Sequence, residues 1–199
     1  MSFSLALIVH ALSLVSMKME NTDAWAADTR DVPDDNIYRK FLIGARVSDL
    51  RDVSRRRAVS TVYYALFHHI NGKAAELIAP NVQPDTNHRI QRWFEHVEMK
   101  RVCGRFLQTK LENPLLGLIG PTASPQMQQV ASSFIKLQDA RHRADYDLGY
   151  SLSSQEAHQL IRLAVTAMAS WDEIANSAEA NIFILSLLMW KNWEEKERR

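Results

Sequence analysis

The sequence is poor in cysteine, glycine and proline, and each shortage excludes a class of protein. Cys103 is the single cysteine among 199 residues, so the chain can form neither an intrachain disulfide nor a zinc site built on cysteines. Six Gly and six Pro exclude collagen-like and low-complexity chains and disfavour an all-β sandwich, which needs many turn residues. The remaining composition, 46% hydrophobic and 24% charged, is typical of a globular protein.

Excess charge of one sign and long apolar runs are also lacking. The chain carries 24 Lys+Arg against 23 Asp+Glu, a net charge of +1, so no global field attracts nucleic acid or an anionic membrane. The longest apolar run, residues 3–15, is too short to cross a bilayer as a helix. The sequence therefore predicts no membrane span and a cytoplasmic location.

The two ends carry apolar segments for which the sequence leaves alternatives open. Residues 3–15 are interpreted as a docking helix or an N-terminal extension. A secretory signal ending at Ala24-Trp25-Ala26 is the disfavoured alternative, because no Lys or Arg precedes the run. Residues 182–190, which a charged tail follows, form either a final helix that covers the bundle or an exposed patch for self-association.

Apolar residues recur at steps of three and four along several segments, which indicates helices. A linker at residues 31–35 is expected to lead into a helix around residues 36–50. The strongest stripe lies between residues 54 and 78, and Pro80 and Pro84 end it. Its members are Val59, Val62, Tyr63, Leu66, Ile70, Ala74 and Leu77.

Capping signals predict three further helices. Asp85 is expected to cap the first of them, and the buried face would consist of Ile90, Trp93, Phe94 and Val97. Ser124 followed by Pro125 is a good start for the second, whose apolar face holds Met127, Val130, Phe134 and Leu137. Between these two, the residues 113–125 are expected to form a loop that tucks in Leu115, Leu116, Leu118 and Ile119.

The third capping signal is a capping box of Ser153 with Glu156, which opens the last long helix. Its inward residues are expected to be Ala157, Leu160, Ile161, Ala164, Val165, Met168, Trp171 and Ile174. No segment alternates convincingly as a strand would, and no repeat is evident.

The predicted fold class is therefore all-α. We expect an antiparallel up-and-down bundle of four to five helices with N- and C-terminal helical extensions. The chain divides into an N-terminal extension at residues 1–35, a helical bundle at residues 36–176, and a C-terminal helix with a charged tail at residues 177–199.

A charged pair continues the apolar stripe that begins at Met127. One helical step beyond Leu137 is Arg141, and the next step reaches Asp145. Burying an arginine is costly unless it is paired, and Asp145 is a ready partner four residues away. Two interpretations stay open: an ion pair that fixes helix register, or an arginine held at a groove to meet phosphate, which its planar fork suits.

The helix from Ser54 offers a polar and aromatic flank beside its apolar stripe. The flank consists of Arg56, Ser60, Tyr64, Phe67, His68 and Asn71. Such residues lie either at the edge of the core or on the surface that faces Arg141. No metal site is predicted, because His68 and His69 point about 100° apart on a helix and His88 lies too far from His96 to share a metal.

Two segments together resemble the HEPN (higher eukaryotes and prokaryotes nucleotide-binding) family. Residues 57–68, Arg-Ala-Val-Ser-Thr-Val-Tyr-Tyr-Ala-Leu-Phe-His, look like its signature helix. Residues 141–146, Arg-His-Arg-Ala-Asp-Tyr, are similar to the arginine motif of its small prokaryotic branch. A histidine at residue 88 lies between the two segments and a final helix follows, so the resemblance covers roughly residues 36–176.

The resemblance implies a helical bundle that forms a homodimer, with the arginine motifs of two protomers meeting at a cleft. Many members are metal-independent endoribonucleases, found in phage-defence systems or as toxins beside a minimal nucleotidyltransferase. Others bind RNA, nucleotides or protein partners without catalysis. The expected partners are a second copy of the chain, RNA or a nucleotide, and a nucleotidyltransferase-type antitoxin, and no cofactor is expected.

The resemblance also implies roles for individual residues. Arg141 would contact phosphate, Asp145 would orient Arg141, and Tyr146 or His142 would serve proton transfer. The cleft would be lined for RNA or nucleotide binding by Arg56, Ser60, Tyr64 and His68.

The sequence departs from the family where nucleolytic members carry a histidine, about four to six residues after the arginine. Tyr146 stands at this place, and a phenol, which titrates near about pH 10, is a poor general base at neutral pH. Two hypotheses follow: an endoribonuclease that is weak or specialised, and a non-catalytic module that binds a nucleotide or a protein partner.

Overall fold

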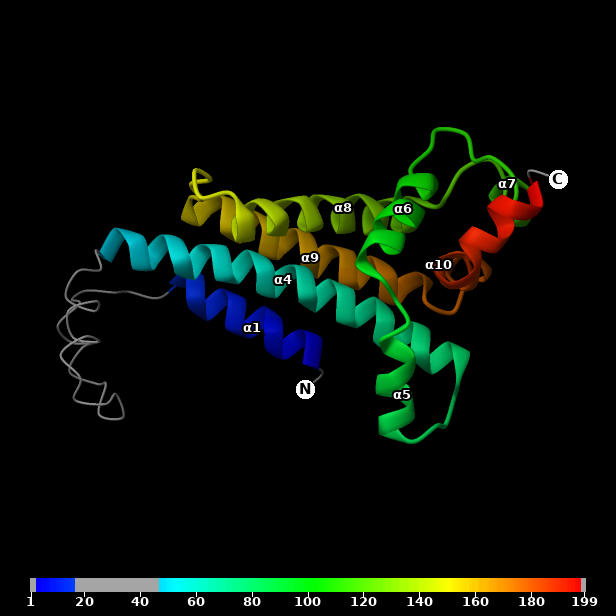
Figure 1. The fold of residues 1–199 in the computed structure, drawn as a ribbon, viewed down its shortest axis with the longest axis horizontal. Helices are drawn as coiled ribbons and strands as arrows, with labels where there is room; N and C mark the ends of the chain where they lie inside the picture. Colours follow the sequence, from blue (N-terminus) through cyan, green and yellow to red (C-terminus); the bar gives the residue numbers. More distant parts are fainter. Residues whose placement is uncertain (1–2, 17–46, 198–199) are drawn as a thin grey trace.

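The chain folds into α-helices, and the computed structural model describes residues 3–16 and 47–197 (Figure 1). The helices are α1 (Phe3–Ser16), α4 (Val47–Ile78), α5 (Pro84–Gln91), α6 (His96–Phe106), α7 (Leu115–Ile119), α8 (Pro125–Tyr146), α9 (Ser154–Ile174) and α10 (Ala178–Glu197). No strand occurs in these two stretches, so the predicted all-α class is confirmed. The expected linker at 31–35, the proposed cleavage site at 24–26 and most of the helix at 36–50 lie outside the described residues.

The longest helix, α4, lies at the centre of the molecule because α1, α8 and α9 all pack against it. Figure 1 shows α8 running opposite to α4 and α9. Enclosed on several sides, α4 buries every residue from Ala58 to Tyr63, more than a single apolar stripe would bury. Of the predicted stripe only Leu77 is exposed, because it lies in the last turn of the helix.

Aromatic side chains fill the core where the central helices meet. Tyr63 of α4 packs against Phe134 of α8, with ring centroids 5.5 Å apart, and Trp171 of α9 is fully buried. Phe183 of α10 contacts Trp171 and Phe106 edge to face, at 5.6 and 5.1 Å. These contacts join α6 and α10 to the same core as the bundle.

The apolar segments at the two ends both become helices that pack on the core. Residues 3–16 form α1, which buries Ile8 and Ala11 against the bundle, as the docking-helix interpretation expects. Residues 182–190 lie in α10, which covers the core with Phe183 while Leu185 and Leu188 stay exposed. None of the described helices combines the length and the apolar character needed to traverse a membrane.

Two predicted helix starts are confirmed at the level of single hydrogen bonds. The Ser124 hydroxyl accepts the N–H of Met127 at 3.2 Å, with proline in the first turn of α8. Ser153 and Glu156 form the capping box, in which the Ser153 N–H donates to the Glu156 carboxylate at 2.8 Å. Hydrogen bonds from the Ser153 side chain and backbone lower the pKa of the Glu156 carboxyl.

The segment after Pro80 differs from the prediction in where its helix begins. Gln83, not Asp85, is the residue at the N-cap of α5, and Pro84 takes the first helical position. Proline suits that position because its missing N–H would have no partner there.

The same segment also differs in where its helix ends. The helix stops at Gln91 and α6 begins at His96, so the helical period is broken between them. Ile90 and Phe94 are buried as predicted, whereas Trp93 is 63% exposed and Val97 is exposed as well. A single helix through this segment was therefore the wrong prediction.

Two smaller differences concern α9 and the loop before α8. On α9 the core contacts follow a narrower stripe than predicted, which leaves Val165 47% exposed and buries Ala167 instead. The segment predicted as a loop at 113–125 contains the short helix α7, which buries Leu115 and exposes Leu118.

The packing of α9 predicts a contrast between two substitutions on this helix. Ile161→Ala should lower the free energy of unfolding by about 2 to 5 kcal/mol, because Ile161 is buried in the main core. Val165→Ala, the matched control, should change it by less than about 0.5 kcal/mol. Urea unfolding followed by circular dichroism measures both, and equal losses would contradict this orientation of α9.

Candidate functional site

Arg141 lies near the end of α8, and its side chain, 26% exposed, faces α4. Its Nε lies 2.6 Å from Oδ2 of Asp145, one helical turn further along. Its Nη2 donates to the Tyr64 hydroxyl of α4 at 3.2 Å. Within the part of the chain that the structure describes, Nη1 has no hydrogen-bond partner. The guanidinium is thus held in place and still has donor capacity left.

Asp145 is held in turn by α4. Ser60, which is buried, donates to Oδ1 of Asp145 at 2.5 Å, while Oδ2 faces Arg141. Ser60 and Tyr64 are four residues apart on α4, as Arg141 and Asp145 are on α8, so each pair occupies successive turns of its helix. We call these four residues the seam cluster, and all of them were predicted site residues.

The electrostatics of the seam cluster keep Arg141 charged. Partial burial alone would lower the pKa of its guanidinium, but the electrostatic interactions with Tyr64, Asp145 and Tyr146 outweigh burial and raise it. Asp145 therefore interacts with a permanent cation one turn away.

The two candidates for proton transfer lie on the outer side of the seam cluster. Tyr146 is 66% exposed, and the centre of its ring lies 5.7 Å from Cζ of Arg141. The ring of Tyr64 lies at the same distance on α4, so both phenols make cation–π contacts with the guanidinium. His142 is exposed and contacts the Tyr146 ring, with centroids 5.0 Å apart.

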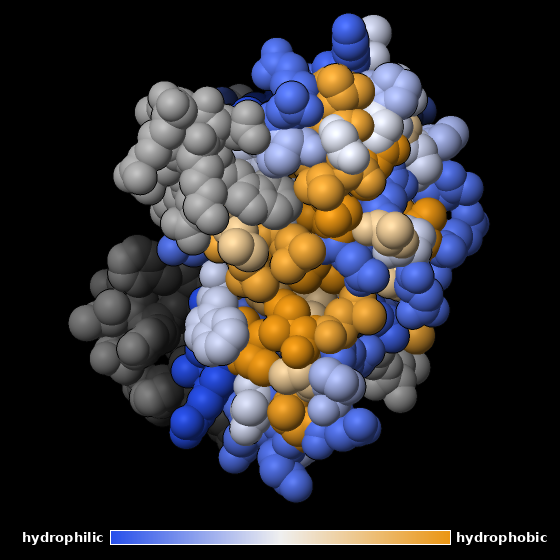
Figure 2. All heavy atoms as spheres, turned by 90° about the vertical axis from the view of Figure 1, so that its right-hand side faces the viewer, coloured by the Kyte–Doolittle hydropathy of each residue, from blue (hydrophilic) through white to orange (hydrophobic). Residues whose placement is uncertain are grey.

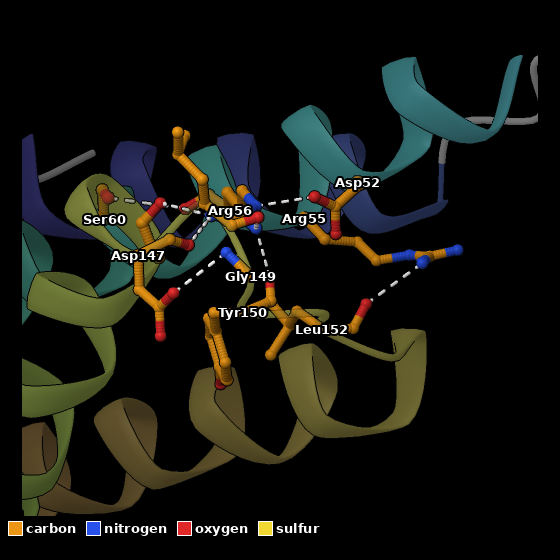
Figure 3. Close-up of polar contacts among 10 residues, drawn as sticks. Asp52, Arg55, Arg56, Ser60, Asp147, Gly149, Tyr150 and Leu152 are labelled. Atoms are coloured by element: carbon orange, nitrogen blue, oxygen red, sulfur yellow. Dashed lines mark hydrogen bonds and ion pairs between the residues drawn. The ribbon is translucent and has the colours of Figure 1, made fainter. Parts of the chain in front are cut away.

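Arg56 of α4 binds the end of α8 (Figure 3). Its guanidinium donates to backbone oxygens in and just after the last turn of α8, and its Nε contacts Asp52 at 2.6 Å. The acceptors are the carbonyl oxygens of Ala144, Asp147, Leu148 and Tyr150. Such carbonyls have no partner within the helix, so Arg56 caps α8 and holds the loop to α9.

Arg55 adds a second contact to the same loop. Its Nη1 donates to the carbonyl oxygen of Leu152 at 3.0 Å (Figure 3). Neighbouring arginines of α4 thus bind successive parts of the connection between α8 and α9. The geometry gives Arg56 a structural task at the end of α8, and its contact with RNA stays a prediction.

Two histidines lie beside Tyr64, one predicted and one missed. His68, a predicted site residue, stacks on Tyr64 at 6.2 Å. His96 contacts the Tyr64 ring edge to face at 5.9 Å and lies 3.9 Å from the ring of Phe67. No local pattern could have indicated His96, because it reaches the site from α6 through the break after α5.

Burial lowers the pKa of both histidines, and for His96 the positive charge of Arg141 lowers it further. His96 Nδ1 lies 2.5 Å from the hydroxyl of Tyr63. Burial raises the pKa of that hydroxyl, so it keeps its proton. Among the described residues Nδ1 is the only hydrogen-bond partner of this hydroxyl. In the tautomer in which Nδ1 accepts from Tyr63, the ring proton of neutral His96 resides on Nε2.

An open groove of about 1280 Å³ begins at these histidines. Its walls come from the first turn of α1, from α4, from α5, from the start of α6 and from the end of α9. Phe3, Phe67, His68 and His96 contribute rings to the lining, and Gly72 contributes bare backbone. Over the described stretches no three acidic, histidine or cysteine side chains are grouped so that they could hold a metal ion.

The chain was compared with protein-family models, curated proteins and solved structures, and none of them matches it.

The contacts of Arg56 predict a loss of stability when it is truncated. Arg56→Ala should lower the free energy of unfolding by about 2 kcal/mol, because it removes the side-chain donor that binds several carbonyl oxygens at the end of α8 and in the loop after it. The neighbouring Arg57 is exposed, so Arg57→Ala should cost less than about 0.5 kcal/mol. Thermal unfolding of the two variants tests this, and equal stability would contradict a capping role for Arg56.

The lowered pKa values of the two histidines predict a pH dependence of stability. Between their folded pKa values and the usual 6.5, the unfolded chain binds more protons than the folded one. Stability should therefore fall as the pH drops below 6.5, and His96→Gln should make this loss smaller. Imidazole titration by NMR measures the pKa values directly, and midpoints at or above 6.5 would contradict the geometry.

Proposed function

We propose that the chain is an HEPN-type protein that acts on RNA, with Arg141 as the group that contacts phosphate. One observation carries the proposal: both family-like segments contribute to the environment of the Arg141 guanidinium. Residues 57–68 supply Ser60 and Tyr64, and residues 141–146 supply Asp145. The guanidinium of Arg141 is planar, held in one orientation and still partly exposed, so its N–H groups suit the oxygens of a phosphodiester.

The reaction we propose is metal-independent cleavage of the RNA backbone. The 2′-hydroxyl of the substrate gives up its proton to water and attacks the adjacent phosphorus, which forms a 2′,3′-cyclic phosphate, and the P–O5′ bond to the next nucleotide breaks. Arg141 stabilises the charge that develops on the non-bridging oxygens. Tyr146 lies beside the guanidinium and is exposed, so it can deliver a proton to the leaving oxygen. His142 contacts the Tyr146 ring, so it would take part in proton transfer from a position beside Tyr146.

A second candidate is a non-catalytic HEPN-like module that binds a nucleotide or a protein partner. The observation that favours it is an apolar face at the end of the molecule that carries α7 and α10, away from Arg141 (Figure 2). Exposed apolar side chains of this end include Leu118, Leu185, Leu188 and Met189. A second copy of the chain, or a nucleotidyltransferase-type antitoxin, could cover such a face.

Arg141 is the residue on which the test depends. Labelled single-stranded RNA is incubated with the purified full chain in EDTA, and both cleavage and binding are measured. Arg141→Ala should reduce cleavage about 100-fold, since it removes a charged donor from the transition state. Arg143→Ala is the matched control, because that guanidinium lies on the ring of Tyr150, 4.8 Å from its centre, and should leave cleavage unchanged.

Each outcome of this assay is decisive. Equal cleavage by wild type and Arg141→Ala would remove Arg141 from the chemistry and contradict the proposal. RNA binding that depends on Arg141 without any cleavage would contradict the proposed reaction and keep Arg141 as a residue that binds RNA. An absence of RNA binding by the wild type would contradict an RNA-acting function altogether.

A further inference from the structure

We propose that the groove bounded by α1, α4, α5 and α9 binds one nucleobase of single-stranded RNA, next to a phosphate held by Arg141. This inference rests on the proposed function and names the part of the substrate that the groove would take. Three observations support it: the side chains that line the groove, the position of His96 in that lining, and the contacts of Tyr64 that join the groove to the seam cluster.

The lining suits a flat heterocycle. Phe67, His68 and His96 present rings to the groove, and Phe3 stands edge-on to His68 with ring centroids 5.3 Å apart. Aromatic rings stack on any base, because every base has a π-face. The amide side chains of Gln91 and Asn176 also line the groove, and amides can donate to and accept from the edges of a base.

His96 adds a ring nitrogen to this lining. In the tautomer in which the Tyr63 hydroxyl donates to Nδ1, the neutral ring carries its proton on Nε2. This N–H has no acceptor among the described residues, while the His96 ring lines the groove. An acceptor atom of a base, such as a ring nitrogen or an exocyclic oxygen, would satisfy it.

The charges of the groove favour an uncharged ligand part over a phosphate. Each acidic side chain of the lining has a nearby partner: Glu76 lies 3.4 Å from Lys73, and Asp172 lies 2.9 Å from His69. With neutral histidines, the positive charges of Lys73 and Arg92 balance the negative charges of Glu76 and Asp172. The interior is therefore close to neutral, whereas the charge that would attract a phosphate is concentrated at Arg141.

Tyr64 connects the two parts of the site. Its ring contacts His68 and His96 on the groove side and lies 5.7 Å from Cζ of Arg141. If the phosphate of a nucleotide contacts Arg141, only the Tyr64 ring separates that phosphate from the groove. Base and phosphate would be recognised by adjoining elements, the base by α4 and α6 and the phosphate by α8.

Gly72 makes the groove testable without disturbing the core. A Cβ placed on Gly72 would meet no atom within 4 Å, so Gly72→Leu projects a side chain into the groove. Gly104 of α6 has equally open surroundings and lies outside the groove, so Gly104→Leu is the matched control. Leucine is a better helix former than glycine, and both variants should fold.

The experiment titrates the full-length protein with the four nucleoside monophosphates and with ribose 5-phosphate, which lacks a base. Ligand-observed NMR should show magnetisation transfer to base protons in the wild type and in Gly104→Leu. Gly72→Leu should weaken binding of the monophosphates about tenfold and leave ribose 5-phosphate unaffected. Equal affinity of wild type and Gly72→Leu for the monophosphates, or no transfer to base protons at all, would overturn the inference.

The two proposals can fail separately in the RNA assay. If Arg141→Ala abolishes RNA binding while Gly72→Leu binds RNA and monophosphates like the wild type, the groove inference is wrong and the proposed function holds. If Gly72→Leu loses the monophosphates while Arg141→Ala keeps full RNA binding and cleavage, the groove takes a base and the assignment of Arg141 is wrong.

Discussion

The seam cluster is the constraint on which the site depends, because it places an ion pair where two long helices meet. An arginine that is partly withdrawn from water is stabilised by a charged partner and by further hydrogen bonds. Asp145 supplies the charge, and Ser60 and Tyr64 supply the hydrogen bonds from the facing helix. Since each pair spans one helical turn, sliding α8 along α4 by a turn would break both hydrogen bonds. The same contacts thus set the register of the helices and orient the guanidinium.

Arg56 and Arg141 show that the same residue type, between the same two helices, can have opposite tasks. Arg56 uses its donors on backbone carbonyl oxygens, which are available because α8 ends there. Arg141 lies on α8, one turn before that helix ends. The carbonyl oxygens around it are already bonded within α8, so Arg141 pairs with side chains and keeps a free donor. The position of a helix end, more than the arginine itself, decides which of the two can meet a ligand.

Most features that depend on neighbouring residues could be predicted from the sequence, the cap placed at Asp85 being an exception, and features that depend on distant contacts could not. The caps at Ser124 and Ser153 and the pairing of Arg141 with Asp145 follow from spacings of three or four residues, and all are present. The break between α5 and α6 carries no comparable signal, so the exposure of Trp93 and the arrival of His96 beside Tyr64 were missed. Arg56 was placed correctly on the flank of α4, but its acceptors come from a loop almost a hundred residues away.

A chain with a net charge of +1 cannot collect RNA through a broad positive field, so its affinity would have to come from a few local contacts. One oriented guanidinium neutralises one phosphate, and that contact is the same for every nucleotide and every sequence. Any discrimination among RNAs must then arise from groups that meet a base. Tyr64 contacts both the His96 ring and the Arg141 guanidinium, so in the proposed site these groups would act on the same nucleotide. In such an arrangement Arg141 would determine whether RNA is held, and the groove would determine which nucleotide is placed for reaction.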